Sequence, residues 1–130
     1  MLVRLAVPLC ALAFAAGCGE EEEPAAPAAL ADLTVRVDPD GPQGPGKVRE
    51  ARVECASEGE GKACAAAGGL KTEAFEPVPE MTACTQIFGG PETAEVKGTL
   101  RGQPVDARFA RNNGCEIDRW KQVQPLLDAA

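Results

Sequence analysis

The chain has 130 residues, 25% of them charged and 45% apolar, which leaves room for one globular domain and excludes a second. Its formal net charge of −7 excludes nucleic acid as the partner, because binding to phosphate depends on neutralisation by lysine and arginine. The sequence has no histidine and a single serine, Ser57, which excludes a Ser–His or Cys–His catalytic pair and an imidazole metal ligand.

The first 17 residues have the features of a bacterial signal peptide. Arg4 supplies a positive charge, residues 5–14 form an apolar run, and residues 15–17 are small. The apolar run is too short to cross a bilayer as a permanent helix. The ending Ala-Ala-Gly-Cys resembles the lipobox of bacterial lipoproteins, which implies that Cys18 becomes the lipidated N-terminus. The alternative is an ordinary cleaved signal peptide.

Residues 18–30 predict an acidic tether. Four consecutive glutamates precede a stretch rich in proline and alanine, a composition that cannot bury a core and stays solvated. With a lipid on Cys18, we expect the chain to be exported and anchored to the outer face of the cell membrane; without the lipid, we expect it to be secreted. Residues 31–130 then form the single domain.

Four cysteines remain for the domain once Cys10, in the signal peptide, and Cys18 are set aside. They are Cys55, Cys64, Cys84 and Cys115. An even number in a small exported domain predicts two disulfides, for which three pairings are possible. A zinc site of four thiolates is the alternative, which the wide intervals and the absence of a C-x-x-C pair disfavour. We therefore expect no metal and no other cofactor.

The domain is predicted to begin with two strands. Residues 33–37 alternate apolar and polar side chains, as a strand with one buried face does, and the turn residues of segment 38–46 end it. Residues 47–55 alternate again and predict an antiparallel neighbour. Ser57 lies in the polar loop that follows, so the role of a loop serine is favoured over that of a nucleophile paired with lysine.

The middle of the domain predicts a helix, an extended segment and a hairpin. Residues 62–67 favour helix by propensity, and the glycine pair after them would end it. Two prolines restrict residues 75–81, which predicts an extended approach to Cys84. Residues 92–100 and 103–111 alternate on either side of an Arg-Gly turn and predict the two strands of the hairpin.

A helix is predicted at the end of the chain. Ile117, Trp120, Val123 and Leu127 are spaced for one helix face, and Trp120 is interpreted as an aromatic that covers the core. Pro125 is expected to disturb this helix near its end. Four or more strands with one or two short helices make an antiparallel α+β domain.

Several short motifs follow one another between residues 33 and 115. They are an opening Leu-Thr-Val strand, a Val-Glu-Cys strand end, Ala-Cys-Ala before the glycine pair, Cys-Thr-Gln-Ile-Phe-Gly-Gly-Pro from residue 84, a Gly-Thr-Leu-Arg-Gly-Gln-Pro-Val hairpin and Asn-Gly-Cys-Glu from residue 113. In this order they resemble the subtilisin-inhibitor-like proteins of actinobacteria, here as a lipoprotein variant. The resemblance implies an antiparallel sheet of about five strands with two short helices, a possible homodimer through the sheet face, and the disulfides Cys55–Cys64 and Cys84–Cys115.

The resemblance also implies inhibition of subtilisin-like serine proteases through a loop that a cysteine opens. Thr85, Gln86, Ile87 and Phe88 would form this protease-binding loop, with Gln86 in the primary pocket of the protease and Gln86–Ile87 as the reactive bond.

Three features depart from the family pattern. Gln86 stands where methionine, lysine or arginine is common. Gly89-Gly90 makes the loop one residue longer and is expected to make it more flexible. The segment from Glu116 predicts a helix where the family has a final strand.

We therefore expect a membrane-tethered inhibitor of serine proteases. The alternative is a non-inhibitory cell-surface interaction module on the same scaffold, which Gln86 and the glycine pair favour. An enzyme is not expected, because only carboxylates remain as catalytic groups and the sequence places no two of them together.

Cys18→Ser should move the protein from the membrane fraction to the soluble fraction, because the thiol that would carry the lipid is lost. Fractionation followed by immunoblotting measures the distribution, with Cys10→Ser as the control that should leave it unchanged. Unchanged membrane retention of Cys18→Ser would contradict lipidation at this residue.

Overall fold

The computed structural model describes residues 28–130. The predicted signal peptide, Cys18 and most of the predicted tether lie outside these residues. The elements follow in the order β1 (Ala31–Asp38), β2 (Arg49–Cys55), α1 (Lys62–Gly68), the 3-10 helix η1 (Thr72–Phe75), β3 (Thr93–Leu100), β4 (Gln103–Phe109) and α2 (Gly114–Ala129). None of the described helices has the length and apolar character that crossing a membrane requires.

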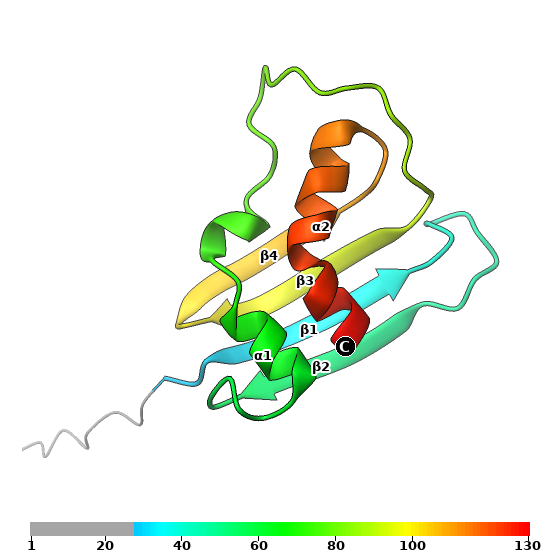
Figure 1. Cartoon of the computed structure of the whole chain (residues 1–130). Helices are drawn as coiled ribbons and strands as arrows, with labels where there is room; N and C mark the ends of the chain where they lie inside the picture. Colours follow the sequence, from blue (N-terminus) through cyan, green and yellow to red (C-terminus); the bar gives the residue numbers. More distant parts are fainter. Residues whose placement is uncertain (1–27) are drawn as a thin grey trace, which may run out of the picture.

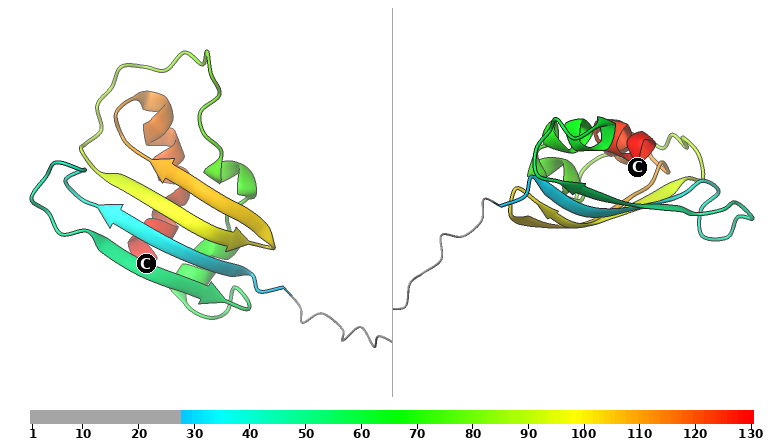
Figure 2. Two further views of the ribbon diagram at one scale, coloured as in Figure 1. Left: turned by 180° about the vertical axis from the view of Figure 1, so that it is seen from behind. Right: turned by 90° about the horizontal axis from the view of Figure 1, so that it is seen from below.

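The four strands form one antiparallel sheet in the order β2-β1-β3-β4. β1 is paired on both sides, so that Val35 stands opposite Ala51 of β2 and Val96 of β3. β3 and β4 form the predicted hairpin, in which Leu100 faces Gln103 across the turn. The helices cover one face of this sheet (Figure 1 and Figure 2). The domain is therefore antiparallel α+β, as the sequence predicts.

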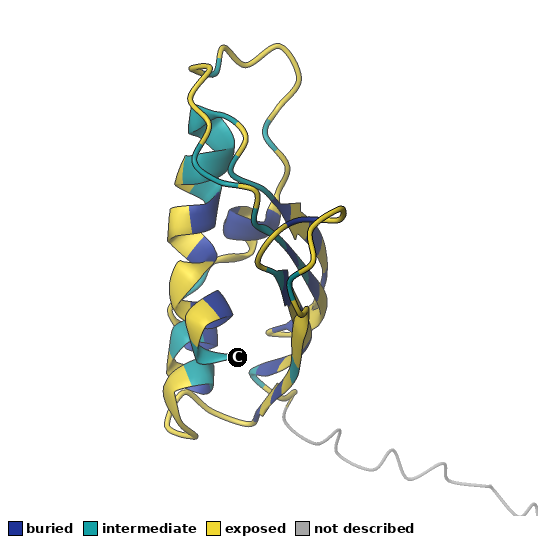
Figure 3. Cartoon of the chain, turned by 90° about the vertical axis from the view of Figure 1, so that its right-hand side faces the viewer, coloured by how far each residue is buried: buried dark blue, intermediate teal, exposed yellow. Residues whose placement is uncertain are grey.

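The core lies between the sheet and the helices, as the burial colours in Figure 3 show. In β1 the predicted alternation is confirmed, since Leu33 and Val35 are buried while Thr34 between them is exposed. The buried residues of α2 are Trp120, Val123, Leu126 and Leu127. The rings of Phe75 in η1 and Phe109 in β4 pack edge to face with centroids 6.3 Å apart. This contact ties the end of β4 to the residues that precede the long connection to β3.

Both disulfides pair as the resemblance implies. Cys55–Cys64 joins the end of β2 to α1 and is buried. Cys84–Cys115 joins the connection between η1 and β3 to the start of α2. Because all four thiols are used in disulfides, the alternative of a four-thiolate zinc site is excluded.

The face of the sheet that the helices leave uncovered is polar. Side chains that alternate with the buried ones point to this face, and ion pairs lie across it from Arg52 to Asp32 at 3.2 Å and from Arg108 to Glu95 at 3.3 Å. Exposed pairs of this kind contribute about 0–1 kcal/mol each. A homodimer through this face would have to bury these charges, and it stays a prediction.

The expectation of about five strands is wrong, because the sheet has four. The family's final strand is absent, because the C-terminal residues form the helix α2 that the sequence predicts, from Gly114 to Ala129. Asn113 caps this helix, since its side-chain Oδ1 accepts a hydrogen bond from the backbone N–H of Glu116 at 3.0 Å. At 16 residues α2 is also longer than expected.

Smaller differences lie at the ends of the elements. β2 begins at Arg49 and β4 ends at Phe109, two residues inside the predicted strands. η1 was not predicted, so the extended segment expected from residue 75 begins only after this helix. A turn at Met81, whose φ is 66°, interrupts it again. These short features depend on packing and turn geometry that alternation does not encode.

Pro125 does not end α2 where the sequence predicts a disturbance, and the helix continues to Ala129. Proline has no N–H to bond the carbonyl four residues earlier, so the helix lacks one hydrogen bond at this point. Leu126 and Leu127 follow directly and are 0% and 1% exposed. Their burial against the core holds the last turn in place in spite of the proline.

We expect Pro125→Ala to raise the free energy of unfolding by about 2 kcal/mol. The helical hydrogen bond and relief of the ring clash gain about 3 kcal/mol, and the looser unfolded chain takes back about 1 kcal/mol. Urea unfolding followed by Trp120 fluorescence measures the difference. Gln124→Ala, at the exposed position before it, is the control and should change the value by less than about 0.5 kcal/mol. A Pro125→Ala protein no more stable than wild type would show that α2 accommodates the ring at no cost.

Candidate functional site

The long connection between η1 and β3, residues 76–92, is the candidate loop. It rises from η1 and passes over the amino end of α2 before it descends to β3 (Figure 1). Residues 82–90 within it contain no helix and no turn. All four residues predicted to bind a protease, Thr85 to Phe88, lie in this stretch.

The amino side of these four residues is fixed by two bonds to the start of α2. The disulfide Cys84–Cys115 brings the two Cα atoms to 5.4 Å from each other. The backbone N–H of Gly114 donates a hydrogen bond to the carbonyl of Thr85 at 2.9 Å. The chain therefore leaves Thr85 from a position that is tied both covalently and by the backbone.

The carboxyl side is fixed by a backbone hydrogen bond. The N–H of Gly89 donates to the carbonyl of Arg111 at 2.6 Å, in the connection between β4 and α2. Gln86, Ile87 and Phe88 thus lie between two attachment points, one at the start of α2 and one in the connection that leads to it. A segment held at both ends loses less conformational entropy when a partner binds it.

The side chains between the attachment points are directed to solvent. Ile87 is 58% exposed and Phe88 is 70% exposed, and Met81 in the same loop is fully exposed. The other large apolar side chain exposed in residues 28–130 is Val48, which precedes β2. Exposed apolar side chains gathered on one segment are typical of a surface that binds another molecule.

Gln86 does not project outward in the same way. Its side-chain Nε2 donates a hydrogen bond at 3.3 Å to the carbonyl of Cys84, so the amide folds back over its own backbone. To enter a pocket, the side chain would have to break this bond and find new partners for its amide. An unpaired buried amide costs about 1–3 kcal/mol.

Gly89 packs closely against the body of the domain. A Cβ atom at this position would lie 2.8 Å from Cδ1 of Ile117 and 3.2 Å from the carbonyl oxygen of Arg111. A larger residue would have to displace the Ile117 side chain and would crowd the Arg111 carbonyl, so glycine favours the close approach of the Gly89–Arg111 hydrogen bond. The sequence suggested that the glycine pair loosens the loop, whereas the structure uses Gly89 as an attachment point.

Sequence reasoning missed Arg111 and Glu92, which form an ion pair at the carboxyl end of the loop. Arg111 Nη1 lies 3.0 Å from Glu92 Oε1, and both side chains are about 31% exposed. A signal for this pair was present in the sequence. The hairpin pairs Leu100 with Gln103 and Ala94 with Phe109, and extending this register by two residues places Glu92 opposite Arg111.

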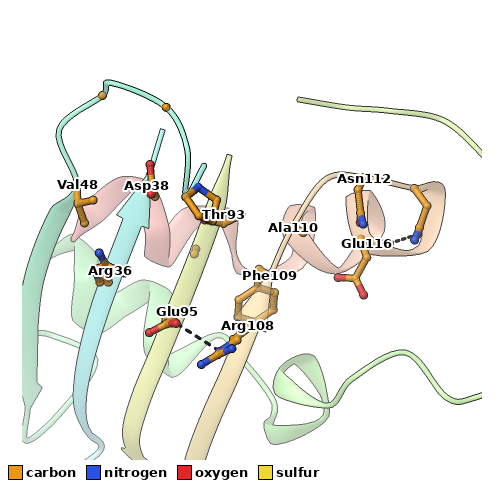
Figure 4. A pocket seen from close by; sticks show the side chains of 15 residues that line it. Arg36, Asp38, Val48, Thr93, Glu95, Arg108, Phe109, Ala110, Asn112 and Glu116 are labelled. Atoms are coloured by element: carbon orange, nitrogen blue, oxygen red, sulfur yellow. Dashed lines mark hydrogen bonds and ion pairs between the residues drawn. The ribbon is translucent and has the colours of Figure 1, made fainter. Parts of the chain in front are cut away.

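A groove of about 700 Å³ lies at the end of the sheet beside the base of the candidate loop (Figure 4). Its lining carries charges of both signs, with Arg36 from β1 and Glu95 and Arg108 from β3 and β4. Arg108 and Glu95 pair with each other, and no single charge dominates the lining. The described residues 28–130 contain no group of three or more side chains that could hold a metal ion.

Ser57, the one candidate for a Ser–Lys pair, is exposed in the connection between β2 and α1. It lies on a different connection from the candidate loop. The site therefore consists of the loop, its two attachment points and the Arg111–Glu92 pair.

Comparisons of the chain with models of protein families, with curated proteins and with solved structures found no match. The family that the motifs resemble is therefore an inference from those motifs, and the function has to be argued from the geometry of the site.

Replacing Cys84 and Cys115 together by serine should lower the free energy of unfolding by about 3–4 kcal/mol, because the unfolded chain loses a constraint between residues 31 positions apart. It should also make the bonds from Gln86 to Phe88 the first to be cut by a broad-specificity protease. Urea unfolding and mass spectrometry of the fragments measure the two effects. If the loop of the variant is cut no faster than that of wild type, the hydrogen bonds alone hold it.

Proposed function

We propose that the chain is an inhibitor of subtilisin-type serine proteases that offers Thr85 to Phe88 to the protease as if they were substrate. The observation that carries this proposal is the exposed stretch with attachment points on both sides, Cys84–Cys115 and Thr85–Gly114 before it and Gly89–Arg111 after it. The order of sequence motifs supports the same conclusion.

The first step is docking of the loop in the protease cleft. An exposed stretch without helix or turn can align beside a strand of the protease and pair with it through backbone hydrogen bonds. Ile87 and Phe88 would fill sites on the leaving-group side with apolar side chains. Because both ends of the stretch are attached in the free protein, little ordering cost opposes docking.

The second step is attack on the Gln86–Ile87 bond. The serine Oγ of the protease adds to the Gln86 carbonyl carbon, the C–N bond breaks, and the histidine of the protease gives its proton to the departing Ile87 nitrogen. The attachment points keep this new amine beside the acyl-enzyme. The amine then attacks the ester, the peptide bond forms again, and the serine regains its proton.

The choice of target depends on Gln86. The hydrophobic primary pocket of a subtilisin-like enzyme would have to accept a neutral amide, which costs about 1–3 kcal/mol if its polar atoms stay unpaired. In addition, the hydrogen bond from Gln86 to the Cys84 carbonyl would be lost on binding. We therefore expect inhibition that is weaker than the attached loop would otherwise allow.

The second candidate function is a non-inhibitory interaction module at the cell surface. The folded-back amide of Gln86 favours it, because a side chain that stays on its own backbone fills no pocket. In this function Met81, Ile87 and Phe88 would bind a protein partner that does not cut the chain. The exported location and the lipid at Cys18 belong to both proposals.

Gln86→Met should tighten inhibition of a subtilisin-like protease about tenfold, because an apolar side chain of similar length needs no buried partners and 1.4 kcal/mol corresponds to a factor of ten. Gln86→Lys should shift inhibition toward trypsin-like enzymes, whose primary pocket carries a carboxylate. Inhibition constants of the purified protein against one protease of each class measure both effects.

Gln103→Met, at the exposed first position of β4 and remote from the candidate loop, is the matched control and should leave both constants unchanged. If wild type and both Gln86 variants inhibit neither protease and are simply cut after residue 86, the interaction module replaces the inhibitor.

A further inference from the structure

The two halves of the Gln86–Ile87 bond are held by different means. On the amino side a disulfide fixes Cys84, and this bond survives cleavage of the loop. On the carboxyl side the described contacts are noncovalent and converge on Arg111. We propose that Arg111 is a positioning residue that keeps the Ile87 amine beside the acyl-enzyme after cleavage, an inference that rests on the proposed function.

Three contacts connect Arg111 to the candidate loop and to α2. Its carbonyl accepts the hydrogen bond of Gly89 at 2.6 Å, and its Nη1 pairs with Glu92 Oε1 at 3.0 Å. Its guanidinium carbon lies 5.9 Å from the centroid of the Trp120 ring, a side chain that is 8% exposed. Arg111 therefore joins residues 89–92, the descending limb of the loop, to the buried Trp120 of α2.

The contacts with Glu92 and Trp120 use the particular shape of arginine. A planar guanidinium can lie over an aromatic ring while its edge donates to a carboxylate, and it keeps its charge at all physiological pH values. The pair is half-buried, so solvent screens it less than it screens the pairs on the open sheet face. We therefore expect the Arg111–Glu92 pair to stabilise the loop more than an exposed surface pair would.

The distance from the reactive bond to this anchor is short. Ile87 and Phe88 are the residues between the new amine and Gly89, so the amine cannot move more than about 7 Å from the Gly89 nitrogen. As long as Arg111 holds Gly89 and Glu92, the amine stays within reach of the ester carbon. Attack by the amine then forms the Gln86–Ile87 bond and returns the proton to the serine oxygen, whereas attack by water would give the free acid and end inhibition.

Arg111→Gln keeps the backbone carbonyl that binds Gly89 but removes the side-chain contacts with Glu92 and Trp120. Without these contacts residue 111 holds the loop less firmly, so the balance should shift from religation to hydrolysis. We expect Arg111→Gln to be converted to the cut form at least about tenfold faster than wild type by a stoichiometric amount of a subtilisin-like protease, which appears as temporary inhibition. The Gly89 amide should exchange its hydrogen about tenfold faster, while amides of the central strand β1 stay as protected as in wild type. Glu92→Gln should act in the same direction.

Arg119→Gln is the matched control. The Arg119 side chain is 12% exposed, so it is more deeply buried than that of Arg111; it pairs with Glu116 at 2.7 Å and lies over an aromatic ring, that of Phe109, at 4.8 Å. Its hydrogen bonds go to Glu116 and to the carbonyl of Arg108, and so not to the candidate loop. A general loss of stability would affect both arginine variants, whereas retention of the amine would be lost in Arg111→Gln alone.

The outcomes separate this inference from the proposed function. If wild type inhibits but Arg111→Gln is cut, and exchanges at Gly89, no faster than Arg119→Gln, Arg111 has no positioning role and the inhibitor proposal stands. If wild type inhibits no protease, both fall, and exchange at Gly89 then shows only whether Arg111 holds the limb. Should Arg111→Gln not fold, Arg111→Lys keeps the charge opposite Glu92 without the planar fork and should be cut at a rate between those of wild type and Glu92→Gln.

Discussion

The candidate site depends on the pairing of β3 with β4. The two-residue turn at Arg101-Gly102 sets the register of this hairpin, and the register decides what stands at its far end. At the far end of the hairpin, the end of the loop meets the connection to α2. Glu92 therefore lies beside Arg111, and the N–H of Gly114 reaches the carbonyl of Thr85. A slip of one residue would turn Phe109 away from the core and would move Arg111 out of its position opposite Glu92.

Much of the fold could be predicted because alternation along a strand and glycine after a helix are local signals. The strand at residues 33–37 and the hairpin were visible in this way, and the motif order implied both disulfides. The C-terminal helix that replaces the family's final strand was also visible, from the apolar spacing of residues 117–127. Its start and its continuation past Pro125 were not, because they depend on the Asn113 cap and on the burial of Leu126 and Leu127 in the folded core. The residues of the loop were predicted from the sequence, but the Arg111–Glu92 pair that holds its carboxyl end was not. Glu92 and Arg111 are 19 residues apart, and only the pairing of β3 with β4 brings them together.

The two proposed functions use the same geometry and differ in one side chain. Ile87 and Phe88 are exposed in either case, and the attachment points make the stretch between them ready to bind. What decides between inhibition and plain binding is whether the Gln86 amide leaves the Cys84 carbonyl and enters a pocket. Moving the amide into a pocket costs one weak hydrogen bond and the burial of an unpaired amide, about 1–3 kcal/mol in free energy. A single substitution can change the free energy by this amount.

β1 runs from the end of the domain where the described chain enters to the opposite end, which carries the candidate loop. The described chain enters the sheet at Ala31, and the strand runs from there to Asp38, which pairs with Thr93 directly after the candidate loop. Eight residues of strand span about 25 Å. A domain attached to a cell surface through the residues before Ala31 would therefore carry its loop on the side that faces away from that surface, where a large enzyme can approach it without obstruction.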